Sequence, residues 1–346
     1  MPLTTTPEFQ AVILASISDG DTLAPMTNTL PLALLPVANR PLISYQLELL
    51  ARSHSFKQVL VLTTDRWLPQ LSTWVTESYK GPLQVELLVV PDEAGSAQAL
   101  HHIKAHLVTD FVVLAGDVIT DLPFQRMADL HRLQGAGVTA LFHESAPREA
   151  GVAKKAKDLD GIDFVGIDER GQRLLSLEAA ADCEDNTITV SQSLLRAYPH
   201  VTLRTDLVDA HVYIFARWAL EVLGLKEHFV SAKFELLPYL VRKQFLPKAN
   251  LATARRDSAS RVAKLTAQTK AGGAGAAGAS ADVAAGGGGG GDLAAGAAAG
   301  DDLSAFAMAT GEATRRQLEH ADDFRCCCYI MAHDSAYCLR TTSVKE

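Results

Sequence analysis

Residues 11–22 join an apolar run to a short polar loop, an arrangement in which backbone N–H groups can hold phosphate. Ala11–Ala15 (AVILA) suits a buried strand, and the small residues of Ser16–Thr22 (SISDGDT) follow it directly. Peptide N–H groups near such a turn attract anions. This loop, however, contains Asp19 and Asp21 and no Lys or Arg. The segment therefore predicts a phosphate-binding loop that has lost its positive side chains.

A second candidate is Asp117, which follows the apolar run Phe111–Ala115. A carboxylate at the carboxyl end of a buried strand suits a hard divalent cation such as Mg²⁺. One carboxylate is a weak site, however, because Mg²⁺ usually also needs substrate phosphates or a second acid. Two interpretations stay open for Asp117: a residual nucleotide or metal contact, or an inherited structural role as the cap of a helix or turn.

Three segments around these residues resemble the motifs of one enzyme family. Thr22–Ile43 (TLAPMTNTLPLALLPVANRPLI) is similar to the signature of sugar-1-phosphate nucleotidyltransferases, G-x-G-T-R-L-x-P-L-T-x-x-x-P-K-x-L-L-P-V-x-x-x-P-L-I. Pro91–Leu100 (PDEAGSAQAL) resembles the family's G-T-A-x-A-L loop, and Leu114–Asp121 (LAGDVITD) resembles its strand-end Gly-Asp. The resemblance implies the fold of that family.

The same alignment of motifs indicates that the catalytic cations are missing. Thr22 stands in the place of the family's Arg, Leu32 stands in the place of the Lys after Pro31, and Gly20 is the one glycine left in the loop. In the family reaction a sugar phosphate attacks the α-phosphate of a nucleoside triphosphate, and cations stabilise the charge that develops. Two unit charges about 4 Å apart interact by roughly 4 kcal/mol at an effective dielectric near 20. We therefore expect little or no transferase activity and assign no catalytic residue.

The resemblance also implies which residues could keep a residual nucleotide contact, namely Gly20, Thr22, Gly95 and Asp117. Asp117 and Asp209 are candidate remnants of a metal site, and neither is assigned as a ligand. Asp209 and the nearby His211 lie in a strand-like run where the family often places its second metal or sugar contact; the alternative is that they anchor the backbone at a sheet edge. We expect no cofactor, with a residual nucleotide or Mg²⁺ as the open alternative.

Later segments narrow the resemblance to the gamma subunits of eukaryotic translation initiation factor 2B. These segments are Asp163–Asp168, Gly171–Leu175, Leu207–Tyr213 and Glu235–Phe245, and a weaker match resumes near Arg325–Thr341. The C-terminal hexapeptide repeats of that family are not found here. The resemblance implies a non-catalytic regulatory and scaffold subunit of the exchange factor for initiation factor 2. Its partners would be the epsilon and other subunits of initiation factor 2B, with initiation factor 2 as the client. The alternative is an active sugar-1-phosphate nucleotidyltransferase that makes a GDP- or ADP-sugar.

Alternating apolar and amphipathic segments predict the elements that must position these motifs. The expected strands are Gln10–Ala15, Gln58–Thr63, Gln84–Val89, Phe111–Ala115, Gly137–Phe142 and His211–Phe215, with helices such as Leu42–His54 and Ala97–His106 between them. That order predicts an α/β domain with a doubly wound, mostly parallel, Rossmann-like sheet of the sugar-nucleotidyltransferase type. The Ser16 loop, the Ala94 loop and Asp117 should converge at the carboxyl ends of the strands.

Composition divides the chain into three expected parts. Residues 8–249 are the predicted nucleotidyltransferase-like domain. Residues 250–302 are predicted to be a disordered Ala/Gly linker, because so few large apolar side chains cannot offset the loss of chain entropy. Residues 303–346 are predicted to be a truncated tail with no stable fold alone.

The overall composition excludes several classes of protein. The net charge of −8 argues against a nucleic-acid surface, which normally needs a basic face. No apolar run has the length of a membrane span, and the N-terminus lacks the layout of a signal peptide. The five cysteines show no paired C-x-x-C spacing, so we expect reduced thiols and not a zinc site. We expect a cytosolic protein.

Overall fold

A computed structural model of the chain describes residues 8–17, 23, 26–145, 163–180, 183, 188, 190–226, 228–245, 324–332 and 337–340. All of them belong to one compact unit made of Met1–Phe245 and His320–Glu346. The predicted linker, 250–302, lies outside the described residues. Gly20 and Thr22 of the predicted phosphate loop also lie outside them.

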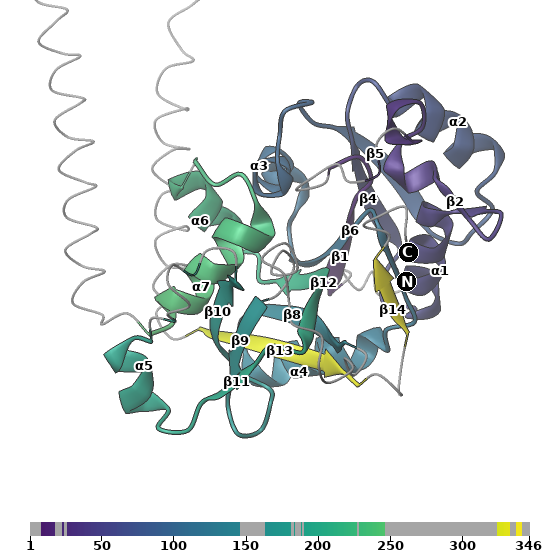
Figure 1. Ribbon diagram of the computed structural model, residues 1–346. Helices are drawn as coiled ribbons and strands as arrows, with labels where there is room; N and C mark the ends of the chain where they lie inside the picture. The colour runs from purple at the N-terminus through teal and green to yellow at the C-terminus, as the bar shows by residue number, and fades with distance from the viewer. Residues whose placement is uncertain are drawn as a thin grey trace, which may run out of the picture. The chain divides into compact units, whose positions relative to one another are not determined.

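A seven-stranded sheet forms the centre of this unit (Figure 1). Its strands are β1 (Phe9–Leu14), β4 (Gln58–Thr63), β5 (Gln84–Val89), β6 (Asp110–Ala115), β8 (Ala136–Glu144), β12 (Leu207–Phe215) and β13 (Arg325–Met331). The strand order is β13-β8-β12-β6-β1-β4-β5. Strands β5, β4, β1 and β6 are mutually parallel, β12 is antiparallel to β6 and β8, and β13 is parallel to β8. The predicted mostly parallel sheet is confirmed.

Helices cover both faces of the sheet, as expected for a doubly wound fold. One core contains side chains of α1 (Leu42–Arg52), α2 (Leu68–Glu77) and α4 (Phe124–Gln134). The other core contains side chains of α3 (Ser96–His102), α6 (Ala219–Leu225) and α7 (Leu237–Lys243). Along β1, Ala11 and Ile13 face the first core while Val12 and Leu14 face the second, because successive strand residues point to opposite sides. This is why the strand reads as a continuous apolar run.

Smaller elements lie around the main sheet. An antiparallel sheet of order β10-β9-β11 contains β9 (Asp163–Ile167), β10 (Leu174–Ala179) and β11 (Thr202–Arg204). Two short antiparallel pairs join β2 (Pro36–Val37) to β3 (Arg40–Pro41) and β7 (Val118–Thr120) to the distant β14 (Cys338–Arg340). The remaining helical segments are 3-10 turns at Met26–Asn28, Leu32–Leu34 and Lys104–His106, α5 (Gln192–Ala197) and a π-helical turn at Ala232–Leu236.

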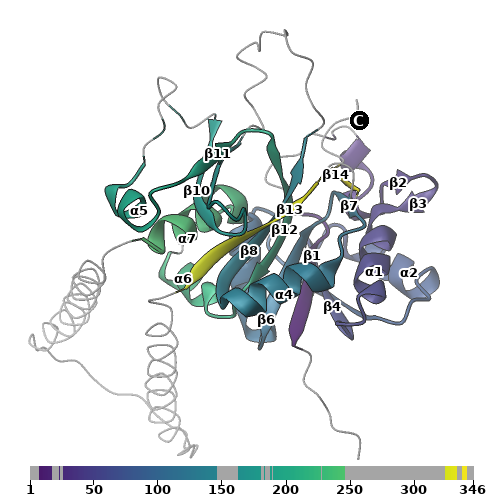
Figure 2. The same cartoon turned by 90° about the horizontal axis from the view of Figure 1, so that it is seen from below.

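The C-terminal segments differ from the expected separate tail. β13 runs along β8 at one edge of the main sheet (Figure 2), and β14 pairs with β7. Burial explains the docking of β13, because Cys326 and Cys328 enter one core and Met331 enters the other. Residues 324–332 and 337–340 are therefore part of the folded domain.

Candidate functional site

The candidate site lies at the carboxyl ends of the parallel strands, as the fold predicts. At the end of β1, Ser16 Oγ is 3.0 Å from Thr63 Oγ1 at the end of β4. Ala33 N donates to Ala15 O over 3.2 Å, which places the 3-10 turn Leu32–Leu34 against the end of β1. Leu32 itself packs, partly buried, with the apolar side chains of Leu23, Leu35 and Leu42.

Two features fix Asp117 in the turn between β6 and β7. A Cβ atom on the preceding Gly116 would come within 2.4 Å of Leu14 O, so only glycine allows β6 to end this close to β1. The buried Gln46 of α1 donates through Nε2 to Ala115 O (2.7 Å) and Val118 O (3.2 Å), bridging the two sides of the turn. Asp117 is consequently held in place with only 5% of its surface exposed.

The Asp117 carboxylate forms an ion pair with Arg340 of β14. Both Nη2 and Nε of Arg340 donate to Asp117 Oδ2, over 2.5 and 3.1 Å. The third nitrogen of the guanidinium, Nη1, lies 2.8 Å from Nε2 of His211. Because arginine has only donors, this ring nitrogen accepts and the ring proton of neutral His211 is on Nδ1. Arg340 thus joins the strand-end acid to the histidine of β12.

His211 occupies an irregular point of β12. The pairing of β12 with β8 shifts register between Asp209 and Tyr213, and His211 has the left-handed φ of 54°. Asp209 stabilises this bulge, because its Oδ1 accepts from His211 N (2.7 Å) and its Oδ2 accepts from Tyr213 OH (2.6 Å). Burial, together with the cations of Arg340 and Lys233, holds the pKa of His211 well below its usual value. The arrangement therefore keeps His211 neutral.

A second ion pair lies beside Asp209. Lys233 Nζ of the π-helical turn is 3.1 Å from Asp163 Oδ2 of β9, and both side chains are almost buried. Burial raises the pKa of Asp209, while the positive charge of Lys233 opposes that shift. In this region Asp117 and Asp163 are thus paired with the cations Arg340 and Lys233. Asp209 accepts hydrogen bonds from the backbone and from a tyrosine.

Gly95 has a packing role in the structure. It is the residue before α3, and a Cβ atom there would come within 2.4 Å of Val230 O. The two segments are joined by hydrogen bonds from Ala97 N to Val230 O (2.9 Å) and from Ala232 N to Ser96 Oγ (2.7 Å). Only glycine therefore permits this loop to close on the Val230 segment.

The structure brings some predicted site residues together and separates others. Asp117 and His211 share Arg340, and Asp209 reaches the pair through the backbone of His211. The alternative expected Asp209 and His211 to anchor the backbone at a sheet edge: Asp209 does bond to the backbone of His211, but β12 is an inner strand between β8 and β6. Arg340 was not singled out from the sequence; a single arginine in a segment with few regular signals carries no pattern that identifies it.

The residues around Asp117 do not fit the divalent cation that the enzyme resemblance implies. Mg²⁺ needs near-octahedral oxygen ligands, usually including several waters. Here the guanidinium of Arg340 lies on Asp117 Oδ2 at hydrogen-bond distance. Among the described residues, no three His, Cys, Asp or Glu side chains gather as a metal-binding group. Among the described residues, Asp117 is therefore paired with a cation of the protein and has no group of acids, histidines or cysteines with which to hold a metal ion.

Comparison with known proteins finds a matching family model and similar individual proteins. The family described as "Nucleotidyl transferase" matches residues 10–165. The chain is 32% identical over 255 residues to "Translation initiation factor eIF2B subunit gamma" of Dictyostelium discoideum, covering 68% of this chain and 58% of that protein. The chain is similar to eIF2B gamma subunits over about two thirds of its own length. The resemblance stated from the sequence is confirmed.

Two further proteins are similar to this chain, one over about two thirds of its length and one over less than half. The eIF2B gamma subunit of Schizosaccharomyces pombe is 32% identical over 243 residues, covering 69% of this chain and 52% of that protein. A mannose-1-phosphate guanyltransferase of Debaryomyces hansenii is 30% identical over 149 residues, covering 41% of this chain and 40% of the enzyme. The chain therefore spans between half and three fifths of the length of the eIF2B gamma relatives. None of the described helices combines the length and apolar character needed to cross a bilayer.

Proposed function

We propose that this chain is a non-catalytic regulatory and scaffold subunit of the guanine nucleotide exchange factor that acts on translation initiation factor 2. The similarity to eIF2B gamma subunits over about two thirds of the chain carries the proposal. In this role the nucleotidyl transferase domain is a surface for assembly that supports GDP/GTP exchange. Its partners are the epsilon and other subunits of eIF2B, its client is initiation factor 2, and it works in the cytosol.

The geometry of the strand-end site supports the non-catalytic part of the proposal. Nucleotidyl transfer needs positive charge free to hold phosphates while negative charge develops. The cation nearest to Asp117, Arg340, is already paired with that carboxylate and with His211. Leu32, at the position where the enzyme resemblance places a lysine, packs in an apolar cluster. Under this proposal the domain needs neither nucleotide nor Mg²⁺ for its role.

Co-purification tests the proposal directly. A tagged copy of the full chain is captured from its own cells under gentle conditions, and the proteins bound in near-equal amounts are identified by mass spectrometry. The expected partners are an epsilon subunit and the other eIF2B subunits. Recovery of a sugar-nucleotide enzyme in near-equal amount, or of the chain alone, would contradict the proposal. A second readout is the rate at which the captured complex releases labelled GDP from initiation factor 2.

The second candidate function is an active sugar-1-phosphate nucleotidyltransferase that makes a GDP- or ADP-sugar. The observation that favours it is the similarity to the mannose-1-phosphate guanyltransferase over 149 residues. That similarity covers less of the chain than the similarity to eIF2B gamma subunits. Partner identity separates the two functions, because an active transferase has no need of an exchange-factor subunit.

A further inference from the structure

We propose that Arg340 is a built-in cation that takes the place of a metal ion at Asp117. By pairing with this acid, Arg340 excludes divalent cations from the strand-end site and fastens the C-terminal strand β14 to the domain. This inference stands on the geometry of the described residues. It holds whether or not the chain assembles with exchange-factor subunits, so its test is independent of the co-purification experiment.

The burial of the pair gives the first argument. The Asp117 side chain is 7% exposed and the Arg340 side chain is 22% exposed. A carboxylate removed from water is costly unless an opposite charge and hydrogen bonds compensate it. Arg340 supplies one positive charge and two hydrogen bonds to the same oxygen. At Asp117 Oδ2, Arg340 therefore already provides the positive charge that a metal ion would otherwise provide.

The shape of the guanidinium gives the second argument. Arginine presents its donors in a planar fork, and here the fork is shared between a carboxylate and a ring nitrogen. His211 Nε2 accepts from Arg340 Nη1 over 2.8 Å, so this histidine nitrogen is also occupied. A divalent cation at Asp117 would displace Arg340 from both groups. It would also leave a guanidinium positive charge beside the metal ion.

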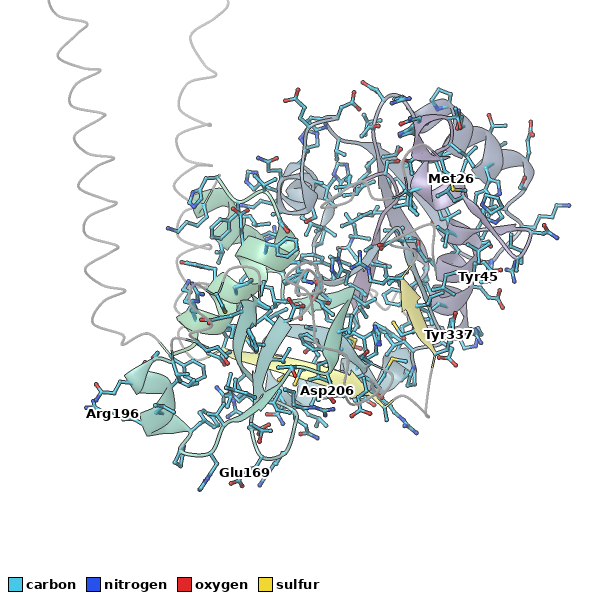
Figure 3. The ribbon with its side chains drawn as sticks, viewed as in Figure 1. Met26, Tyr45, Glu169, Arg196, Asp206 and Tyr337 are labelled. Atoms are coloured by element: carbon cyan, nitrogen blue, oxygen red, sulfur yellow. The ribbon has the colours of Figure 1, made fainter. Side chains whose placement is uncertain are left out.

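The backbone of β14 gives the third argument, because it fixes where Arg340 can be. Residues 338–340 pair antiparallel with β7, and Arg340 lies opposite Val118, the residue that follows Asp117. The start of the strand is anchored at Tyr337, whose carbonyl accepts from Thr120 Oγ1 (2.8 Å) and from Asp121 N (3.1 Å). Figure 3 labels Tyr337 on the same side of the domain as Tyr45 of α1, the helix that packs on β7. The pairing of β14 with β7 therefore fixes the position of Arg340 next to Asp117.

A metal-dependent unfolding experiment tests the exclusion of cations. Thermal unfolding of the full chain is recorded with and without millimolar Mg²⁺ or Mn²⁺ for four proteins: wild type, Arg340→Ala, Asp117→Asn/Arg340→Ala and the control Arg325→Ala. Arg325 belongs to the other C-terminal strand, and its exposed side chain donates to the side chain of Gln134 over 2.9 Å. We expect Arg340→Ala to lower Tm by roughly 5 °C or more, since it removes the positive charge that is paired with a buried carboxylate.

The change in Tm on adding a metal ion shows whether Arg340 excludes divalent cations. Mg²⁺ or Mn²⁺ should restore part of the lost Tm in Arg340→Ala and leave the wild type, the double variant and Arg325→Ala unchanged. The proposal is overturned if the metals stabilise the wild type as much as Arg340→Ala. It is also overturned if Arg340→Ala unfolds at the wild-type temperature, or if a folded Arg340→Ala gives no metal response.

Hydrogen exchange tests the fastening of β14 even if Arg340→Ala does not fold. Asp117→Asn removes the charge but keeps a hydrogen-bond acceptor, so we expect this variant to fold. The amides of residues 338–340 should exchange at least several-fold faster than in the wild type, because a neutral partner holds Arg340 less tightly. The amides of 326–331 in β13 should be unchanged. Unchanged exchange at 338–340 would overturn the proposal.

Discussion

Asp209 holds His211 in a left-handed backbone conformation: its Oδ1 accepts a 2.7 Å hydrogen bond from the backbone N–H of His211, whose φ is 54°. A non-glycine residue in this region carries strain that its surroundings must offset. Two hydrogen bonds of His211 offset this strain: its backbone N–H donates to Asp209, and its ring nitrogen accepts from Arg340. The bulge of β12 and the strand-end ion pair therefore depend on each other.

We predict that Asp209→Ala destabilises the domain by about 2–3 kcal/mol. The substitution removes two hydrogen bonds, one from the backbone of His211 and one from the hydroxyl of the buried Tyr213. Tyr213→Phe is the matched control, because it removes one of these bonds and leaves the bulge intact, at a cost of about 1 kcal/mol. Urea unfolding of both variants measures the difference. Equal losses in the two variants would show that Asp209 does not support the backbone of His211.

Gly95→Ala should destabilise the domain by about 1–3 kcal/mol, because the added Cβ meets the backbone oxygen of Val230. Gly224→Ala in α6 is the control, since a Cβ there has only ordinary contacts, the nearest at 3.5 Å. Alanine favours a helix over glycine, so this control should be neutral or stabilising by up to about 1 kcal/mol. Thermal unfolding of the two variants compares them. A Gly95→Ala protein as stable as the wild type would contradict the described closure of the loop.

His131 should make the domain less stable in acid. Burial lowers the pKa of His131 to about 4, and its Nδ1 lies 2.9 Å from Thr139 Oγ1. Since the folded pKa is below the unfolded value near 6.5, the folded state binds fewer protons. This contribution to stability is complete above about pH 6.5 and is lost as the pH falls toward 4. At about 1.4 kcal/mol per pH unit, the loss reaches roughly 3 kcal/mol.

Urea unfolding between pH 7 and pH 4.5 measures this contribution. His131→Gln should flatten the fall in stability across that range, whereas the exposed His102→Gln should keep the wild-type profile. An unchanged slope in His131→Gln would mean that His131 is not neutral in the folded domain.

The cysteines of β13 should be inert toward thiol reagents until the domain unfolds. Burial raises the pKa of Cys327 to about 11 and also raises the pKa values of Cys326 and Cys328 above the usual value for a thiol. The thiolate is the reactive form, and little of it is present in the folded state at neutral pH. Labelling followed by mass spectrometry should modify Cys183, which is partly exposed, well before these three. Rapid labelling of β13 in the folded protein would contradict its place in the sheet.

Continuous apolar runs made much of the fold predictable from the sequence. Gln58–Thr63 and Gln84–Val89 are predicted and observed with the same bounds, because each run is flanked by polar or turn-forming residues. The helix expected at Leu42–His54 ends at Arg52, and the one expected at Ala97–His106 becomes α3 followed by a 3-10 turn. These differences are at element ends, where local propensity is weakest.

The contacts that define the site were not predictable in the same way. Arg340 pairs with Asp117 because β14 adds to β7, and such strand pairing between distant segments leaves no local pattern. The left-handed His211 depends on the side chain of Asp209 and on its neighbours, not on its own preference. A sequence motif identified Asp117 as the acid at the end of the strand. No motif identified Arg340 as its partner.

Under the proposed function, this domain keeps the nucleotidyl transferase fold and does not carry out nucleotidyl transfer. Pyrophosphate release tests it most directly: the purified full chain is incubated with Mg²⁺, each nucleoside triphosphate and a panel of sugar 1-phosphates, alongside its Asp117→Asn variant. The account predicts no release above that of the variant for any pair of substrates. Sustained release that Asp117→Asn abolishes would contradict it.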